Sequence, residues 1–488
     1  MSEIFEMTAV ELGRKIKSGE ISPVEAADKS LERIKNSDLN AYITVLEGEA
    51  AGQAERVRRG IESGKFQGPL AGVPAALKDN ICTRGIRTSC ASKILGGFKP
   101  PYNATAVEWM QDSGAVILGK TNMDEFAMGS TTETSYYGKT LNPWNKKHVP
   151  GGSSGGSAAS VAAGEAFYAL GSDTGGSVRN PAAFCGITGM KPTYGVISRY
   201  GLIAYASSLD QIGVLARSAE DCAAVLDMIS GRDGRDSTSM NAAAGKLLES
   251  LTGDIRGKKV GLPTDCFGDD LNPEVRGSVL EVTKVLESLG ATTEYFPMEL
   301  TQFAVPAYCM IACAEASSNL SRFDGVKYGF RAENYDDIAS LYKNTRSEGF
   351  GWEVKKRILL GTFALSAEYY DAYYKKAQQV RAAISRAYRE AFEKFDFVLS
   401  PVSPNTAPEI GASVTDPMKK YLSDIYTVSV NLAGLPGISV PCGFDTKGLP
   451  IGAQIIGRAF GDAQVLNVAF AYQRETQYHK KYAWKEVK

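Results

Sequence analysis

Two glycine- and serine-rich stretches and one lysine are the parts of this chain best suited to acyl transfer. The first stretch, GGSSGGS, contains Ser153, and the second, SDTGGS, ends at Ser177. Lys78 follows the apolar run VPAAL. A serine hydroxyl is a weak nucleophile at neutral pH and needs a base within hydrogen-bonding distance. Because the chain contains only two histidines, we expect the base to be the lysine.

A lysine acts as a base only when its amine is uncharged. An exposed lysine, with a pKa of about 10.4, stays protonated at neutral pH. Burial away from carboxylates disfavours the charged form and lowers the pKa. We therefore expect Lys78 to be buried and its neighbour Asp79 to point away from the amine. A second serine between base and nucleophile can relay the proton, because a hydroxyl both donates and accepts.

The glycines around the two serines have separate expected roles. In the run Thr174, Gly175, Gly176, missing side chains let successive backbone N–H groups point at one oxygen, as an oxyanion hole requires. In GGSSGG, glycine tolerates a strained backbone such as a cis non-proline peptide. That conformation would aim one serine hydroxyl at the lysine.

Two other motifs compete with this interpretation. Ser153 and Ser154 each fit the G-x-S-x-G pattern of α/β-hydrolases, but the only downstream histidine is His479, in a segment typical of a solvated helix end. The stretch GAVILGKT at 114–121 matches a phosphate-binding loop literally, yet its four apolar residues predict a strand. We therefore expect Lys120→Ala to be tolerated, unlike Lys78→Ala or Ser177→Ala.

The pair GGSSGGSAASVAAG and GSDTGGSVRNPAAFCGITGMKPTYG resembles the amidase-signature family. The resemblance is close over a core of about residues 70–215 and looser over nearly the whole chain. It implies a Ser-Ser-Lys triad in which Ser177 is the nucleophile, Ser153 is a bridging cis-serine and Lys78 is the base. It also implies a single amidase domain over residues 1–488, an α/β/α sandwich around a large mixed β-sheet.

Segments outside this core are similar to the glutaminase subunits of tRNA-dependent amidotransferases. The similar segments are EASSNLSRFDGVKYG, KKRILLGTFALSAEYYDAYYKKAQQVR and DIYTVSVNLAGLPGISVPCG. By this resemblance Arg357 binds the α-carboxylate of glutamine and Asp424 binds its α-ammonium, and each pairing is chemically well matched. Without the resemblance, a surface ion pair is the simpler interpretation of either residue.

The resemblance implies that the chain hydrolyses glutamine and supplies ammonia to a partner. In a heterotrimer, the B-subunit would use ATP and Mg²⁺ to convert Glu-tRNA(Gln) into Gln-tRNA(Gln), and the C-subunit would complete the complex. No cofactor or metal is expected in this chain itself. The alternative is a stand-alone hydrolase of a small aryl or aliphatic amide, whose pocket would lack a clamp for a zwitterion.

Composition agrees with a globular cytoplasmic enzyme. The chain has 54 basic and 55 acidic residues, so no basic footprint for RNA stands out and a partner would supply most phosphate contacts. No signal-peptide pattern and no apolar run of about 18 residues is present. Eight cysteines without a CxxC pair are expected to be reduced and mostly buried rather than zinc ligands.

Strand and helix patterns alternate along most of the chain and predict an α/β class with a mixed sheet. The expected strands are VPAALK, AVIL, FYALGS, KKVGLP, DFVLSP, GISVPC and IGAQIIG, the last two joined by a turn. Capping boxes at Thr8–Glu11, Ser22–Glu25 and Thr105–Glu108 predict three helix starts. Residues from about 305 to 395 are predicted to be largely helical, with a solvated charged face.

Overall fold

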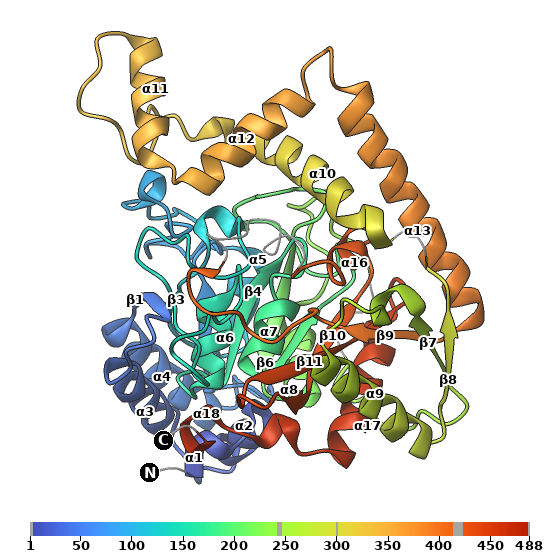
Figure 1. The fold of residues 1–488 in the computed structure, drawn as a ribbon. Coiled ribbons are helices and arrows are strands. Elements are labelled where there is room, and N and C mark those ends of the chain that lie inside the picture. The colour runs from blue at the N-terminus through green and yellow to red at the C-terminus, as the bar shows by residue number, and fades with distance from the viewer. Residues whose placement is uncertain (1–2, 242–245, 299–300, 413–422, 487–488) are drawn as a thin grey trace.

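A mixed β-sheet forms the centre of the molecule (Figure 1). The computed structural model describes residues 3–241, 246–298, 301–412 and 423–486, and these ranges form one 11-stranded sheet. In spatial order its strands are β1 (Tyr42–Val45), β3 (Val116–Thr121), β2 (Pro74–Lys78), β4 (Tyr168–Asp173), β6 (Gln211–Ala216), β5 (Thr188–Lys191), β10 (Gly437–Phe444), β11 (Pro450–Gly457), β9 (Phe397–Pro401), β7 (Lys259–Pro263) and β8 (Thr292–Phe296).

The sheet combines parallel and antiparallel neighbours. Strand β2 runs parallel to β3 and β4, and β7 runs parallel to β8 and β9, whereas the remaining neighbours are antiparallel. All seven expected strands are present, and β10 and β11 form the expected antiparallel pair. The predicted α/β class with a large mixed sheet is therefore confirmed.

Helices cover both faces of the sheet. One face carries α5 (Thr105–Asp112), α8 (Ala219–Ile229), α9 (Pro273–Ser288) and α17 (Asp462–Glu475). The other carries α3 (Pro23–Lys35), α4 (Glu47–Glu62), α6 (Gly155–Ala162) and α7 (Arg179–Cys185). Shorter or peripheral elements are α1 (Glu3–Glu6), α2 (Ala9–Lys17), α16 (Val428–Leu432), α18 (Ala483–Glu486), η1 (Lys93–Leu95), η2 (Glu125–Ala127), η3 (Thr264–Phe267), η4 (Thr301–Phe303), η5 (Leu320–Arg322) and η7 (Tyr478–Lys480).

The strand β2 shows how the two faces divide the core. Ala75 and Leu77 pack with the helices of the α8 side, whereas Ala76 packs with those of the α6 side. Successive side chains of a strand point to opposite faces of the sheet. Lys78, the last residue of β2, therefore has the parity of Ala76 and points toward α6.

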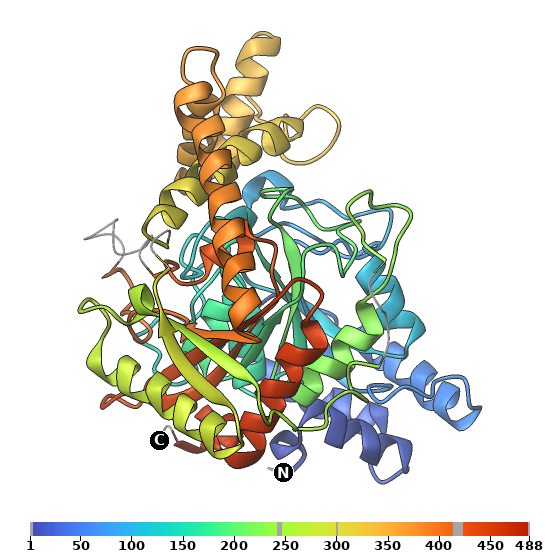
Figure 2. The ribbon, with the colours of Figure 1, turned by 90° about the vertical axis from the view of Figure 1, so that its right-hand side faces the viewer.

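A group of four helices projects at one end of the sheet, and its last member runs back alongside the sheet, as Figures 1 and 2 both show. These helices are α10 (Ala304–Asn319), α11 (Ile338–Gly349), α12 (Trp352–Ala364) and α13 (Lys376–Lys394), with a π-helical turn, η6 (Asp371–Lys375), before α13. The expectation of a largely helical segment at about 305–395 is confirmed. Helix α10 joins this group to the body, because it packs against α12, α13 and α16.

The predicted helix starts had mixed outcomes. The capping box at Thr8 is formed in full, and Ser22 is the expected N-cap of α3, although it accepts from Val24 rather than from Glu25. The box predicted at Thr105 is wrong. Helix α5 begins at Thr105 itself, whose hydroxyl instead donates to Asp233, so a tertiary hydrogen bond replaces the local cap.

The stretch that matches a phosphate-binding loop is the strand β3, with Lys120 inside it. The Lys120 side chain is fully buried and donates to the Ile81 carbonyl at 2.7 Å and to Thr88 Oγ1 at 2.9 Å. Its amine also lies 3.7 Å from Asp79 Oδ1. The structure therefore argues against our expectation that Lys120→Ala is tolerated, since removing the amine would leave buried oxygens without their donor.

We predict that Lys120→Ala lowers the free energy of unfolding by about 3 kcal/mol, the usual cost of removing one partner of a buried pair. Urea denaturation of the purified chain would measure this change. The matched control is Lys146→Ala, which breaks an exposed pair with Asp38 and should cost no more than about 0.5 kcal/mol. Equal stabilities of the two variants would restore the original expectation.

Candidate active site

The amine of Lys78 lies in a fully buried cage of serine oxygens. It is 2.7 Å from Ser153 Oγ, 2.8 Å from Ser154 Oγ, 2.9 Å from Ser172 Oγ and 3.2 Å from the Ser172 carbonyl. Burial lowers the pKa of Lys78 from 10.5 to about 7, against the opposing attraction of nearby carboxylates. A substantial fraction of the amine is consequently neutral at physiological pH.

The cage limits which serine can donate to the lone pair of a neutral amine. Ser154 Oγ accepts from the backbone N–H of Ser172 at 3.3 Å and donates to the Ser172 carbonyl at 3.2 Å, so it can only accept from the amine. Ser172 Oγ accepts from Asn80 Nδ2 at 2.9 Å. The hydroxyl of Ser153, at 2.7 Å, is placed to donate its proton to the lone pair.

Asp79 follows Lys78 directly but does not face its amine. Its carboxylate accepts from the backbone N–H of Ser89 at 2.9 Å and from Ser89 Oγ at 2.5 Å, on the side of Lys120. The carboxylates that attract the Lys78 charge are those of Asp124, Asp173 and Asp210. The expectation that Asp79 points elsewhere is confirmed.

Ser153 is joined to Gly152 by a cis peptide bond. Gly152 has no room for a side chain, because a Cβ there would lie 2.2 Å from Asp124 Oδ2 and 2.6 Å from the Thr131 nitrogen. Ser154 is the N-cap residue of α6, and its backbone N–H donates to the carbonyl of Ser177 at 3.2 Å. The two serine-bearing segments are therefore connected through main-chain atoms.

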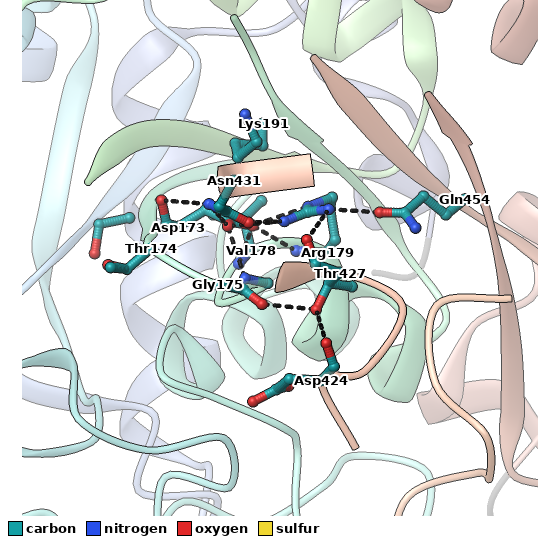
Figure 3. A network of polar contacts seen from close by, with 12 residues as sticks. Asp173, Thr174, Gly175, Val178, Arg179, Lys191, Asp424, Thr427, Asn431 and Gln454 are labelled. Carbon is teal, nitrogen blue, oxygen red and sulfur yellow. Dashed lines mark hydrogen bonds and ion pairs between the residues drawn. The ribbon is translucent and has the colours of Figure 1, made fainter. Parts of the chain in front are cut away.

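Ser177 lies between β4 and α7 with 8% of its surface exposed, whereas Lys78 and Ser153 are fully buried. Asp173 holds the intervening loop. Its carboxylate accepts from the N–H groups of Gly176 at 2.8 Å and Val178 at 3.1 Å, and it pairs with Arg179 at 3.0 Å (Figure 3). Burial alone would raise the pKa of Asp173, but Arg179 outweighs burial and keeps the pKa below its ordinary value.

The same loop carries the backbone N–H groups that we expected to form an oxyanion hole. Within the described residues, no acceptor is hydrogen-bonded to the backbone N–H groups of Thr174, Gly175 or Ser177. The N–H of Gly176, in contrast, already donates to Asp173. The geometry favours Thr174, Gly175 and Ser177 as the available donors and argues against Gly176, and the N–H of Ser177 is a donor that we did not expect.

Arg357 and Asp424 approach this centre from other elements. Arg357, on α12, is 7% exposed and donates to Tyr205 Oη at 2.5 Å and to Glu353 Oε1 at 2.9 Å. Asp424 accepts from Ser130 Oγ at 2.5 Å. The pair of Arg357 with Glu353 is largely buried, so it is not a surface ion pair between two solvated side chains.

Tyr308 connects these two residues with the nucleophile loop. Both Arg357 and Asp424 act on the pKa of the Tyr308 phenol, which burial raises well above its ordinary value. The Tyr308 ring lies against Gly175, where a Cβ would be 2.6 Å from the ring. Thr427 adds a second link, since its hydroxyl is within hydrogen-bonding distance of the Gly175 carbonyl, at 2.6 Å, and of the Asp424 carbonyl, at 3.1 Å (Figure 3).

Sequence reasoning missed several residues of this site. Ser172 and Asn80 belong to the lysine cage, and Tyr308 connects the nucleophile loop with Arg357 and Asp424. The run YCMIACAE around Tyr308 is typical of any buried helix, so no local signal marks the tyrosine. Ser172 lies near the end of the strand β4, just before the nucleophile loop, and this position was the one available signal.

The histidine required by the α/β-hydrolase interpretation is remote from this centre and is not solvated. His479 lies in η7, which contacts β10, and it is 8% exposed. Burial lowers the pKa of His479 to about 4. Our expectation of a solvated helix end is therefore wrong at this position. The eight cysteines are free thiols, and seven of them are buried, as expected.

Comparison with known proteins agrees with this geometry. The family model described as Amidase matches residues 25–466. The chain belongs to the amidase family. It is 57% identical over 473 residues to the A-subunit of glutamyl-tRNA(Gln) amidotransferase of Lachnospira eligens, covering 96% of this chain and 98% of that protein. The resemblance to the amidase-signature family is thereby confirmed.

Two solved structures show that the backbone alone does not distinguish between members of the family with different names. The crystal structure of the glutamyl-tRNA(Gln) amidotransferase A-subunit from Thermotoga maritima is 41% identical, with a TM-score of 0.81 over 99% of this chain and 98% of that one. The structure of 6-aminohexanoate cyclic dimer hydrolase is 27% identical, with a TM-score of 0.85 over 98% of this chain and 99% of that one. Backbone similarity therefore identifies the fold, whereas sequence identity favours the amidotransferase subunits.

None of the described helices is long and apolar enough to cross a membrane. Among the described residues, no group of three or more His, Cys, Asp or Glu side chains is arranged to hold a metal ion.

We predict that amide hydrolysis by this chain rises tenfold per pH unit below pH about 7 and becomes constant above it, because only the neutral amine of Lys78 accepts a proton. The pH dependence of kcat/KM on an uncharged amide would measure this limb. A profile that is flat from pH 5 to about 9 would contradict a lysine base. The variant Glu125→Gln, which removes another group whose pKa lies at about 7, should leave the limb in place.

Proposed function

We propose that this chain is the glutamine-hydrolysing A-subunit of a glutamyl-tRNA(Gln) amidotransferase. One observation carries the proposal: a lysine amine with a pKa of about 7 is held 2.7 Å from a serine hydroxyl, beside a second serine, in a chain 57% identical to such a protein. The proposal takes residues 1–488 as one amidase domain, which is supported by the single sheet that joins β1 to β8.

In the proposed reaction Ser177 Oγ attacks the side-chain amide carbon of glutamine. As the new C–O bond forms, the Ser177 proton passes to Ser153 Oγ, and the Ser153 proton passes to the lone pair of Lys78. The carbonyl oxygen becomes an oxyanion that accepts from the N–H groups of Thr174 and Gly175, and each such donor is worth about 3 kcal/mol in the transition state.

The collapse of this intermediate releases ammonia. The proton held by Lys78 returns through Ser153 to the leaving nitrogen, the C–N bond breaks, and a glutamyl ester of Ser177 remains. Water then attacks the ester with the same relay as base, giving glutamate and free Ser177. The proposed steps call on no metal or cofactor of this chain.

Specificity for glutamine is assigned to Arg357 and Asp424. A guanidinium matches the planar α-carboxylate and a carboxylate matches the α-ammonium, so the side-chain amide is directed toward Ser177. Their placement around Tyr308, whose ring covers Gly175, supports this assignment. A small hydrophobic amide would make neither ionic contact.

The ammonia is consumed outside this chain. In the proposed heterotrimer, the B-subunit uses ATP and Mg²⁺ to convert Glu-tRNA(Gln) into Gln-tRNA(Gln), and the C-subunit completes the complex. The formal net charge of −1 supports leaving the tRNA contacts to the partners. A substrate carried on tRNA supports a cytoplasmic location for the proposed reaction.

The experiment that tests this function compares the chain alone with the chain co-expressed with its two partner subunits. We expect glutaminase activity that increases with the partners and with Glu-tRNA(Gln), and only slow turnover of simple aryl and aliphatic amides. Ser177→Ala and Lys78→Ala should lower turnover by about three or more orders of magnitude. Rapid partner-free hydrolysis of hydrophobic amides would support the stand-alone amidase instead.

We predict that Arg357→Ala raises the KM for glutamine by about 100-fold, because a charge-assisted contact to the carboxylate is worth about 3 kcal/mol. Turnover of propionamide, which lacks the α-carboxylate, should change less than about twofold. Steady-state kinetics of the complex with both substrates would separate these effects. An unchanged KM for glutamine would remove Arg357 from the clamp.

A further inference from the structure

One loop contacts each part of the proposed site. In the segment 122–134, the backbone N–H of Asp124 donates to the Ser153 carbonyl at 3.2 Å. The hydroxyl of Ser130 donates to Asp424 at 2.5 Å. Glu125, between them, contacts the beginning of α12, the helix that carries Arg357. This loop therefore joins the triad to both charged residues of the clamp.

The loop is held in an uncommon backbone conformation. Phe126, Ala127 and Thr132 have φ values of 49°, 61° and 60°, in the left-handed region that non-glycine residues rarely adopt. Such residues persist only when surrounding contacts impose them. Asp124 supplies part of this restraint, because its carboxylate accepts from the N–H groups of Thr131 and Thr132 and from Thr134 Oγ1.

Glu125 is the contact from this loop to α12. Its side chain is 3% exposed, and its carboxylate accepts from the Gly351 N–H at 2.9 Å and 3.1 Å and from Ser92 Oγ. Gly351 is the N-cap of α12. A Cβ at Gly351 would lie 2.3 Å from Glu125 Oε2, so only glycine allows this approach. A carboxylate at a helix N-terminus is also stabilised by the helix dipole.

Helix α12 has few other restraints on its outer side. Trp352 is 73% exposed and Leu359 is 66% exposed, and the helix packs mainly against α10 and η2. Arg357 lies on the inner side, roughly 9 Å along the axis from Gly351 at the rise of an α-helix. A shift of the N-terminal end of α12 would therefore move the guanidinium relative to Asp424.

We propose that Glu125 is a positioning residue for glutamine, which attaches the N-terminus of α12 to the loop that holds Ser153 and Asp424 and so sets the distance between the two ends of the clamp. This role rests on the proposed function, since it presupposes that Arg357 and Asp424 bind one amino acid. Glu125 itself does not touch substrate. Its loss should weaken glutamine binding while leaving the Ser-Ser-Lys chemistry intact.

The charge state of Glu125 gives the proposal a second readout. Burial raises the pKa of Glu125 to about 7, and the Ser92 hydroxyl, the Gly351 N–H and the Lys355 ammonium on α12 oppose that rise. Protonation below this pH removes the charge that attracts the helix N-terminus. The KM for glutamine should therefore increase as the pH falls below about 7, separately from the decline in kcat caused by Lys78.

The test uses the complex of the chain with its partner subunits and the variants Glu125→Gln and Glu125→Ala. We expect the KM for glutamine to rise about threefold in Glu125→Gln, which keeps one acceptor, and about tenfold in Glu125→Ala. For both variants kcat and the turnover of propionamide should stay within about twofold of the wild type. Glu125→Gln should also lose the KM increase at low pH.

Two further variants separate positioning from general loss of stability. Gly351→Ala should raise the KM with Glu125 still present, because the added Cβ displaces the carboxylate. The matched control is Asp337→Asn, which removes a carboxylate at the N-terminus of the neighbouring helix α11 and should leave the KM unchanged. Thermal unfolding of each variant would show whether it is folded under assay conditions.

Unchanged KM values in the Glu125 variants, or equal losses of glutamine and propionamide turnover, would overturn the positioning role while leaving the function in place. A wild-type complex without glutaminase activity would overturn the function and, with it, the role of Glu125. A KM rise in Asp337→Asn as large as in Glu125→Gln would also overturn the proposal, because the loss of a carboxylate charge at any nearby helix N-terminus would then explain the effect.

Discussion

The site depends on keeping one amine uncharged inside the protein. Burial of Lys78 removes the hydration of the ammonium form, and no carboxylate of the described residues lies within hydrogen-bonding distance to stabilise the charge. Hydroxyl groups suit this cage because they can accept from the amine's N–H bonds and, in the case of Ser153, donate to its lone pair. A carboxylate in the place of Ser172 would hold the lysine protonated and remove the base.

The fold brings together the residues of this cage, which come from separate parts of the chain. Lys78 ends β2, Ser172 belongs to the adjacent parallel strand β4, and Ser154 caps α6 on the same face of the sheet. Parallel neighbours bring their carboxyl ends to one edge of the sheet, which is where loops of different sequence origin can meet. The loop that carries Ser177 is held in place by Asp173 and Arg179, which are both fully buried and paired with each other.

A residue's role could be predicted from the sequence only where neighbouring residues or the overall composition indicate it. The glycine-serine tracts are marked by composition, and Lys78 is marked by the near absence of histidine, so the triad could be proposed from the sequence. Thr105 carried a local capping signal that a distant aspartate, Asp233, overrode. Lys120 was judged by a motif rather than by burial, and the cost of leaving Asp79 without its partner was missed. The role of Tyr308 could not be predicted, because it arises only from the packing of α10 against Gly175 of the nucleophile loop.

In the proposed reaction the chemistry and the specificity are carried by different parts of the molecule. The lysine cage is formed by the ends of β2 and β4 and the start of α6, where the side chains are buried, whereas Arg357 lies on α12, a helix whose outer side is open to solvent. Changes in α10 to α13 can alter which amide is held without disturbing the amine. A cyclic-dimer hydrolase at 27% identity shares the backbone over 98% of this chain with a TM-score of 0.85, so side chains rather than the path of the backbone must distinguish the two. Two contacts join these parts: Glu125 with Gly351, and Thr427 with Gly175. Such contacts fix the position of the proposed substrate-binding residues relative to the proton-transfer centre.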